Sequence, residues 1–344
     1  MKENPIVKKD LEFFAEHVPF LDELRGKTFL VTGATGLIGS TFVKCMLTLN
    51  EKWSTGIQIV GMVRNPQKVA DIFGDAPVNW VYQDMKDALQ LSDILIDYII
   101  HCANSTSSKF YVECPVENIN TAYLGTNNLL EYARKRKVKS MVYLSSLESY
   151  GTIHDDREIT EDVMGYITPT DVRSSYSLGK RAVECLCHCY AREYGVHVKM
   201  ARLTQTFGAG VSLEDNRVFA QFAKSVIRGK DIVMHTMGES SKPYCYTIDA
   251  VIAILYLLFK GVDGEAYNVA NSETYISIHD LALFLIDEFN PRCKLLMELR
   301  NDMGYAPVTK LNLDTEKLKS LGWHPFYSLK DMYESLIKYY QTIM

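Results

Sequence analysis

Short β-rich runs alternate with stretches of helical periodicity between residues 27 and 203. The apolar, β-branched or aromatic runs occur at 27–33, 57–63, 78–82, 97–103, 140–146 and 197–203. Between them, apolar residues recur at the spacing of an amphipathic helix, as in LIGSTFVKCMLTL. Strands that alternate with helices are typical of a parallel sheet covered by helices on both faces. The pattern predicts an α/β fold with a doubly wound parallel sheet, whose strand ends line one ligand-binding crevice.

The two ends of the chain follow other patterns. Before residue 27, Leu11, Phe14, Val18 and Leu21 stand at helical spacing and predict a short helical extension. After residue 205 the pattern predicts helices at 216–228, 249–260 and 278–289, strands near 231–235 and 266–269, and two final helices separated by a Gly-Trp-His-Pro turn. We therefore divide the chain into an extension (1–26), a doubly wound domain (27–205) and a smaller C-terminal α/β region (206–344), some segments of which return to the first sheet.

Composition narrows the class of protein. The chain has 344 residues and a net charge of −5, which argues against a nucleic-acid surface. Its longest apolar run, residues 250–259, is shorter than the roughly 18 residues that span a bilayer. The eight cysteines form no C-x-x-C pair and the histidines have no metal-ligand spacing. We expect a soluble cytoplasmic protein, without a bound metal, whose thiols stay reduced.

A glycine loop connects the first strand to the first long helix. Gly33, Gly36 and Gly39 have the spacing G-x-x-G-x-x-G. In this position glycines allow a tight turn, a close approach of a pyrophosphate, and packing of the helix on the strand. The loop predicts that residues 27–205 bind a dinucleotide, NAD or NADP. The cofactor contacts expected in the loop and at the ends of the third and fourth strands are Gly33, Thr35, Gly36, Leu37, Ile38, Gly39, Asp84, Met85, Cys102 and Ala103.

The end of the second strand bears on the choice between NAD and NADP. An acidic residue there would bind the ribose hydroxyl of NAD, but this chain has Arg64. A guanidinium suits a 2′-phosphate, so the sequence favours NADP slightly. An arginine that stacks over the adenine would suit either cofactor. Asp84 after the third strand can bind the adenine amino group or cap a helix, and the two roles are compatible.

A second set of residues carries the chemistry. Tyr176 and Lys180 are four residues apart in a predicted helix and so lie on one face of it. A neighbouring ammonium and a positively charged nicotinamide both favour the phenolate, which lowers the pKa of the tyrosine toward neutrality. Tyr176 could then exchange a proton with a substrate hydroxyl during hydride transfer, with Lys180 also contacting the cofactor. Ser146, at the end of the fifth strand, could donate to the same substrate oxygen.

Six separated motifs resemble one family. The glycine loop with Y-x-x-x-K resembles the short-chain dehydrogenase/reductase superfamily. SSLESYG, RSSYSLGKRAVE, ARLTQTFG, YCYTID and LDTEKLKSLGWHP resemble its extended branch, the NAD-dependent epimerase/dehydratase family of nucleotide-sugar enzymes. The resemblance implies a Rossmann-type fold, a nucleotide-diphosphate sugar as substrate and a homodimer. HCANSTSSKFYVECP, R-x-x-Y-x-x-G-K-R and TFG are most similar to UDP-glucuronate decarboxylases, and the Ser-Leu-Glu run to dTDP-glucose 4,6-dehydratases.

The resemblance also implies roles in the sugar site. Ser146 would partner Tyr176, and Glu148 would be the acid or base of a second step, although a capping or ion-paired glutamate is the alternative. Substrate contacts are expected from Asn104, Thr106, Tyr111, Ser146, Gln205, Arg217 and Lys242. Three residues depart from the family pattern: Leu147 replaces a polar residue, Gln205 an asparagine, and Lys242 an arginine. These departures argue against a standard UDP-glucuronate or dTDP-glucose substrate.

The sequence leaves three functions open. Glu148 favours a lyase, a 4,6-dehydratase or decarboxylase, because a carboxylate near C5 has no task in a plain 4-epimerase. A 4-epimerase or a 4-keto reductase is the alternative enzyme, and an NADP preference would suit the reductase. A cofactor-binding regulator without turnover is the alternative of another class, although the intact Tyr-Lys pair argues against it.

Overall fold

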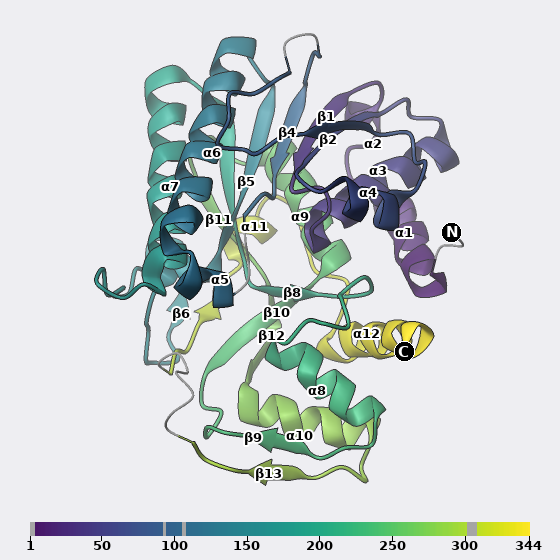
Figure 1. The fold of residues 1–344 in the computed structure, drawn as a ribbon, viewed down its shortest axis with the longest axis vertical. Coiled ribbons are helices and arrows are strands. Elements are labelled where there is room, and N and C mark those ends of the chain that lie inside the picture. Colours follow the sequence, from purple (N-terminus) through teal and green to yellow (C-terminus); the bar gives the residue numbers. More distant parts are fainter. Residues whose placement is uncertain (1–3, 92–93, 105–107, 301–307) are drawn as a thin grey trace.

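A parallel sheet forms the centre of the computed structural model, which describes residues 4–91, 94–104, 108–300 and 308–344 (Figure 1). Within these residues seven strands pair in the order β11-β7-β5-β4-β1-β2-β3, and every pair is parallel. The strands are β1 (Thr28–Thr32), β2 (Gln58–Val63), β3 (Asn79–Tyr82), β4 (Tyr98–His101), β5 (Ser140–Ser146), β7 (Val198–Leu203) and β11 (Ala266–Val269). The predicted Rossmann-type doubly wound sheet is confirmed.

Helices cover both faces of this sheet. One face carries α6 (Pro115–Arg136) and α7 (Ser174–Tyr194), and the other carries α3 (Leu37–Trp53) and α9 (Thr247–Lys260). Alternate residues of β1 serve the two layers: Leu30 packs with the α6 and α7 side, whereas Phe29 and Val31 pack with the α3 and α9 side. Both faces are therefore apolar, as a buried parallel sheet requires.

The remaining connections carry short helices. These are α4 (Pro66–Phe73) between β2 and β3, α5 (Ser108–Glu113) between β4 and α6, and the single 3₁₀ turn η1 (Leu147–Tyr150) after β5. Both α5 and η1 follow the carboxyl ends of central strands, so they lie where ligands bind in such sheets.

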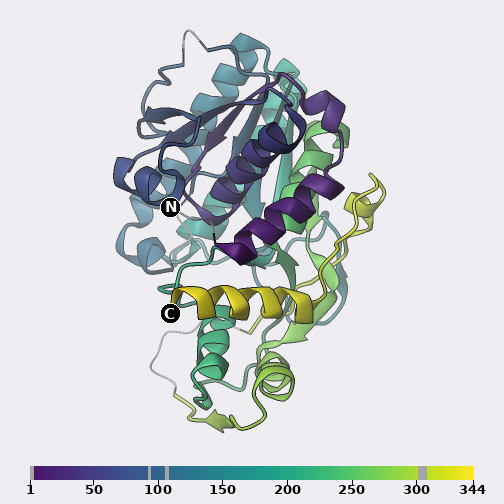
Figure 2. The same ribbon diagram turned by 90° about the vertical axis from the view of Figure 1, so that its right-hand side faces the viewer.

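The N-terminal extension is helical, as expected, and packs on the body of the protein (Figure 2). It comprises α1 (Pro5–His17), capped by Asn4, and the single turn α2 (Leu21–Leu24). The Asn4 side chain donates to Thr342 Oγ1 at 2.6 Å, and Tyr246 Oη donates to Asp10 Oδ2 at 2.5 Å. On its other side the extension contacts the end of α3, where Trp53 Nε1 donates to the Ala15 carbonyl oxygen at 3.3 Å. The extension therefore joins α3 of the central domain to the C-terminal region.

The C-terminal region adds small sheets and four further helices to the described structure. A three-stranded sheet has the order β12-β10-β8, and β13-β9 and β14-β6 form pairs. The elements are β6 (Glu158–Ile159), β8 (Gln205–Phe207), α8 (Val218–Ile227), β9 (Ile232–Met234), β10 (Ser241–Tyr246), β12 (Asn271–Ser277), α10 (Ile278–Phe289), β13 (Leu295–Met297), β14 (Asn312–Leu313), α11 (Glu316–Lys319) and α12 (Leu329–Ile343). Sequence periodicity had not indicated the three-stranded sheet.

The chain returns to the central sheet after leaving it. β11 pairs with β7 at the sheet edge, and α9 packs on the central sheet in the layer with α3. Trp323, in the turn between α11 and α12, is fully buried and donates its indole N–H to the Asp249 carbonyl oxygen at 3.1 Å. No helix in the described ranges is long and apolar enough to cross a membrane.

Candidate active site

The glycine loop joins β1 to α3, and two of its glycines, Gly33 and Gly39, have no room for a side chain. Gly33 has a φ of +63°, and a Cβ there would lie 2.8 Å from the Ala103 backbone nitrogen. A Cβ on Gly39 would lie 2.4 Å from the Gly33 carbonyl oxygen. Gly36 is the N-cap of α3 and is exposed, so no side chain covers the first N–H groups of the helix. The loop thus presents a helix N-terminus suited to an anionic group.

The other predicted loop residues lie in the same turn. Thr35 is half-buried between the first two glycines of the G-x-x-G step, and Leu37 and Ile38 are the first residues of α3. Ile38 and Leu37 pack against the core on the α3 face of the sheet. The residues present therefore fit a dinucleotide pyrophosphate.

Arg64 and Asp84 meet at the ends of β2 and β3. Arg64 Nη1 lies 3.7 Å from Asp84 Oδ2, and the Arg64 side chain is 71% exposed. The other Asp84 oxygen accepts a hydrogen bond from the Lys86 backbone N–H at 3.0 Å, which makes a turn. Met85 is buried against Gly125 of α6. An exposed guanidinium here is free to turn toward a ligand, since an exposed ion pair at this distance is weak.

The end of β4 contributes a short polar segment. The Ala103 N–H donates to Thr32 Oγ1 at 3.2 Å, which ties this segment to the end of β1. Cys102 is half-buried, and burial raises the pKa of its thiol to about 12, so it stays protonated. Asn104 Oδ1 is buried and has no hydrogen-bond partner among the residues that the structure describes. A buried acceptor of this kind suits a ligand donor. Thr106 lies outside the described residues.

Tyr176 and Lys180 point from α7 toward the end of β5. Tyr176 is 6% exposed and Lys180 is 3% exposed. Lys180 Nζ donates to the Leu144 carbonyl oxygen at 2.6 Å and lies 5.7 Å from the centre of the Tyr176 ring. Ser146, the last residue of β5, forms a hydrogen bond with the Tyr176 hydroxyl. The structure thus brings together the three residues that the sequence grouped.

The charge state of this group differs from the expectation. Burial and the nearby Glu148 carboxylate raise the pKa of Tyr176 to about 12, although the Ser146 hydrogen bond acts in the opposite direction. Burial lowers the pKa of Lys180 to about 8, and the Glu184 carboxylate partly offsets that effect. The chain by itself therefore keeps the phenol protonated, because desolvation outweighs the local hydrogen bonds. A pKa near neutrality requires a further positive charge beside Tyr176.

Glu148 lies on the turn η1, next to this group. Its backbone N–H donates to Ser146 Oγ at 3.2 Å, and its Oε2 accepts from Ser177 Oγ at 3.4 Å. The side chain is half-buried. Its negative charge raises the pKa of Tyr176, and it also stabilises the ammonium form of Lys242. Glu148 therefore lies near both the tyrosine on α7 and the lysine on β10.

The side chain of Leu147 packs away from Glu148 and Tyr176. Its side chain is buried in a small apolar cluster with Tyr150, Ile153, Ile159, Leu311 and Leu313. The position at which the family pattern has a polar residue is thus used for packing between η1 and the C-terminal region. The leucine offers no polar group to a ligand.

The C-terminal region contributes Lys242, which lies near Glu148, and two further residues that the sequence assigned to the substrate. Gln205 begins β8 and pairs in register with Tyr244 of β10. Lys242 is half-buried, and burial lowers the pKa of its ammonium group despite Glu148. Arg217 is the N-cap residue of α8. Its guanidinium forms an ion pair with both carboxylate oxygens of Asp215, with Nη2–Oδ2 at 2.5 Å. The charge of Arg217 also lowers the pKa of Lys242, so these two cationic side chains lie near each other.

Two features were not predicted from the sequence. Glu184 and Arg202 form a buried ion pair at 2.8 Å, and Ser145 Oγ also donates to Glu184. Glu184 follows Lys180 by one helical turn, and Arg202 is the residue before the last of β7. The signal available in the sequence was one charged residue in each of two largely apolar segments. The other feature is Tyr111, which the sequence placed at the substrate and which stacks on Tyr176.

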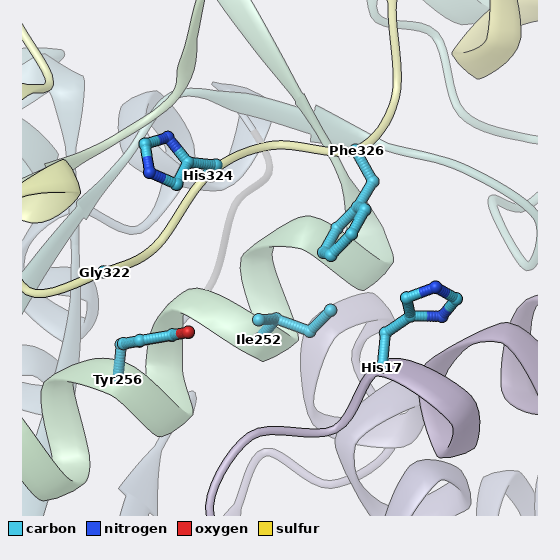
Figure 3. Close-up of a pocket in the computed structure, with 6 residues that line it drawn as sticks. All are labelled: His17, Ile252, Tyr256, Gly322, His324 and Phe326. Carbon is cyan, nitrogen blue, oxygen red and sulfur yellow. The ribbon is translucent and has the colours of Figure 1, made fainter.

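A separate pocket of about 220 Å³ opens elsewhere on the protein (Figure 3). It is lined by His17, Ile252, Tyr256, Gly322, His324 and Phe326. None of these belongs to the predicted site. The two imidazoles and the phenol come from α1, from α9 and from the segment before α12, and their side chains surround a shallow space.

Comparison with known proteins points to one family. Residues 29–270 match the model of the NAD dependent epimerase/dehydratase family. UDP-glucuronic acid decarboxylase 1 of Danio rerio is 27% identical over 96% of this chain and 77% of its own length. UDP-glucuronic acid decarboxylase 3 of Arabidopsis thaliana is 28% identical over 88% of this chain and 85% of its own length.

Solved structures share the fold. UDP-glucose 4-epimerase of Thermotoga maritima, with UDP-glucose, superposes with a TM-score of 0.79 at 23% identity, over 92% of this chain and 99% of that one. dTDP-glucose 4,6-dehydratase of Bacillus anthracis, in complex with NAD, superposes with a TM-score of 0.75 at 20% identity, over 92% and 97%.

Proposed function

Because this chain is an enzyme of the NAD dependent epimerase/dehydratase family, we propose that it modifies a nucleotide-diphosphate sugar through a 4-keto intermediate and acts as a lyase. The observation that carries this proposal is the position of Glu148. Its carboxylate lies close enough to Tyr176 and Lys242 to change the pKa of both, and a second acid–base step on the sugar could occur there. Relatives named as decarboxylases are consistent with a lyase.

The cofactor would be held by residues from three strand ends. The glycine loop would receive the pyrophosphate, Asp84 and Arg64 would flank the adenosine, and Cys102, Ala103 and Asn104 would border the nicotinamide side. Bound NAD(P) would supply a hydride acceptor and donor and a positive charge. The orphaned Asn104 oxygen and the space above Gly36 support this placement.

Tyr176 would exchange the proton. Its phenolate oxygen would take the proton from the C4 hydroxyl of the sugar, the position that the family resemblance implies, and Ser146 would donate a hydrogen bond to that same substrate oxygen. Lys180 supports the phenolate by its charge, held in place by the Leu144 carbonyl. Because the chain alone raises the pKa of Tyr176 to about 12, the tyrosine becomes a base only when a cationic group binds beside it.

Glu148 would act once the sugar carries a ketone. A ketone acidifies the hydrogen on the adjacent carbon, so a carboxylate there can remove it and permit loss of water. A carboxylate carried by that adjacent carbon is part of a β-keto acid and could instead leave as carbon dioxide, because the electrons of the broken C–C bond pass to the ketone oxygen as an enolate. The Glu148 carboxylate stabilises the ammonium form of Lys242, so the two side chains lie close enough to act on the same part of the sugar. Lys242, Arg217 and Gln205 would meet the diphosphate, and Tyr111 would border the sugar.

Product mass tests this proposal. The purified protein is incubated with a panel of UDP-, dTDP-, CDP- and GDP-sugars, and the products are analysed by mass spectrometry. Loss of water or of carbon dioxide from one member supports the lyase. Conversion without change in mass, or with gain of two hydrogens from added NADPH, contradicts it. Conversion without change in mass would indicate the epimerase, and gain of two hydrogens would indicate the reductase.

A 4-epimerase is the second candidate, because Leu147 leaves the sugar without the polar group expected beside Glu148. In that reaction Tyr176 returns the proton to the same oxygen after the sugar ring has turned. Glu148 would then be a hydrogen-bond acceptor for the sugar and not a base.

We further propose a preference for NADP. The exposed Arg64 guanidinium, at the end of β2, can meet a 2′-phosphate if it leaves Asp84. Calorimetry on the wild type and Arg64→Ala tests this. The variant should lose roughly tenfold in NADP affinity and little in NAD affinity. Equal losses for both cofactors would contradict the preference.

The protein is proposed to be a homodimer that pairs through α6 and α7. On α6, Val116, Ile119, Tyr123 and Leu124 are large, apolar and 42–66% exposed. Val116, Ile119 and Tyr123 are three and four residues apart, with Leu124 beside Tyr123, and together they make a seam suited to a partner helix. Ile119→Asp with Tyr123→Asp should give a monomer in sedimentation, whereas Val262→Asp, at an exposed position on a loop, should not. A monomeric wild type would contradict the proposal.

A further inference from the structure

Tyr111 and Tyr176 lie face to face in the candidate active site. Their ring centroids are 4.4 Å apart and their planes differ by 14°. Tyr111 comes from α5 and Tyr176 from α7, and both side chains are buried. The hydroxyl of Tyr111 also forms a hydrogen bond with that of Tyr176. One phenol therefore contacts the other through both its ring and its oxygen.

A chain of hydrogen bonds fixes Tyr111 relative to Tyr176. Ser175, the residue before Tyr176, donates from its Oγ to the Tyr111 carbonyl oxygen at 3.1 Å. Asn118 on α6 donates in turn to Ser175 Oγ at 3.2 Å. All of these groups are buried. Three helices are thus connected at one point, so the backbone of Tyr111 cannot move without disturbing the start of α7.

The direction of the phenol–phenol hydrogen bond is set by charge. It lowers the pKa of Tyr176 and raises that of Tyr111, as expected if Tyr111 donates to a Tyr176 oxygen that carries negative charge. The Glu148 carboxylate opposes ionisation of both phenols. Tyr111 and Ser146 are therefore the neutral donors that counteract Glu148 at the Tyr176 oxygen.

We propose that Tyr111 is a positioning residue for the catalytic tyrosine: its ring fixes the plane of Tyr176, and its hydroxyl stabilises the phenolate by donating a hydrogen bond. This inference rests on the proposed role of Tyr176 as the base. It differs from a contact with the sugar, which would affect substrate binding and leave the ionisation of Tyr176 unchanged. The stacked ring and the hydroxyl hydrogen bond together give Tyr176 a defined orientation before any substrate binds.

The test separates these two roles. A fluorinated tyrosine is placed at position 176, which brings its titration into an accessible range, and ¹⁹F NMR follows its ionisation in the NAD(P)⁺-loaded protein. Tyr111→Phe keeps the stack and removes the donor. Its titration midpoint should rise by about 0.5 to 1 pH unit, the size of one neutral hydrogen bond. Tyr339→Phe, a half-buried tyrosine on α12 outside the proposed site, is the matched control and should leave the midpoint unchanged.

Kinetics provide a second readout. In Tyr111→Phe the acid limb of the rate of hydride transfer should move to higher pH by the same amount, with KM changed less than about twofold. Tyr111→Leu should also broaden the ¹⁹F signal, because the stack is lost. An unchanged midpoint with a raised KM would overturn the proposal. The NMR result does not depend on turnover, so absence of activity on all sugars would contradict the proposed function and leave this inference decided by the titration.

Discussion

The Lys180 ammonium nitrogen lies 2.6 Å from the Leu144 carbonyl oxygen and 5.7 Å from the centre of the Tyr176 ring. The lysine is thus held by the strand β5 and not by the phenol itself. Burial lowers the pKa of Lys180 to about 8, so its charge is stabilised poorly by the chain alone. A lysine with this pKa is about half charged at pH 8. Its support for a phenolate should therefore weaken as the pH rises through that value.

Glu148 should matter for the second step and not for the first. Glu148→Gln removes the charge and keeps the size of the side chain. Lyase product formation should fall by about 10²–10⁴, the usual contribution of a general acid or base. Reduction of bound cofactor, followed at 340 nm in one turnover, should fall by less than about tenfold. The pKa of Tyr176 should also fall, because the Glu148 charge raises it.

Glu214→Gln is the control for this substitution, because Glu214 is exposed on the loop before α8. It should change neither rate. If Glu148→Gln forms product at the rate of the wild type, the carboxylate has no role in a second step, and the lyase proposal loses its support.

Two glycines of the loop should respond differently to alanine. A Cβ on Gly39 would lie 2.4 Å from a backbone oxygen, so Gly39→Ala should lower the free energy of unfolding by about 1–3 kcal/mol. On Gly36 the nearest atom would be 3.3 Å away, and the residue is exposed. Gly36→Ala should therefore keep its stability and lose cofactor affinity, because the methyl group covers the helix N-terminus. Denaturant melts and calorimetry distinguish the two. Equal cofactor affinity in Gly36→Ala and wild type would show that no phosphate approaches this residue.

Asp10 should make stability depend on pH. Burial raises its pKa to about 7, although the Tyr246 hydrogen bond acts in the opposite direction. The folded state then holds more protons than the unfolded state between the unfolded pKa near 4 and pH 7, so stability falls as the pH rises through this window. Asp10→Asn should raise the free energy of unfolding at pH 8 by about 1–2 kcal/mol and have little effect at pH 4. The exposed Asp22→Asn is the control. A variant that is less stable than wild type at pH 8 would contradict the assigned pKa.

Much of the fold could be predicted because its strands are buried on both faces. Runs such as KTFLVTG and SMVYLSS have the continuous apolar character that a central parallel strand requires, and they became β1 and β5. β8 has three residues, and β12 reads NSETYIS. Neither length nor alternation identifies such strands, since their pairing with β10 depends on contacts between distant segments.

The candidate site, like the fold, could be predicted from the sequence only in part. The i, i+4 spacing placed Tyr176 and Lys180 on one face of α7, and both are buried there. The stack on Tyr111 could not be predicted, because it depends on how α5 packs against a helix 65 residues away in the chain. The sequence also could not indicate that Leu147 turns into an apolar cluster, since a 3₁₀ turn sends neighbouring side chains in different directions.

The central claim is that Tyr176 takes the substrate proton as hydride leaves the sugar, and one measurement tests it most directly. Wild type and Tyr176→Phe, each loaded with NAD(P)⁺, are mixed with the nucleotide sugar that the panel identifies, and absorbance at 340 nm is followed over one turnover. The variant keeps the ring and its stack, so it should bind substrate with similar affinity and reduce cofactor about 10²–10⁴ times more slowly. Reduction at the wild-type rate in Tyr176→Phe would contradict the account.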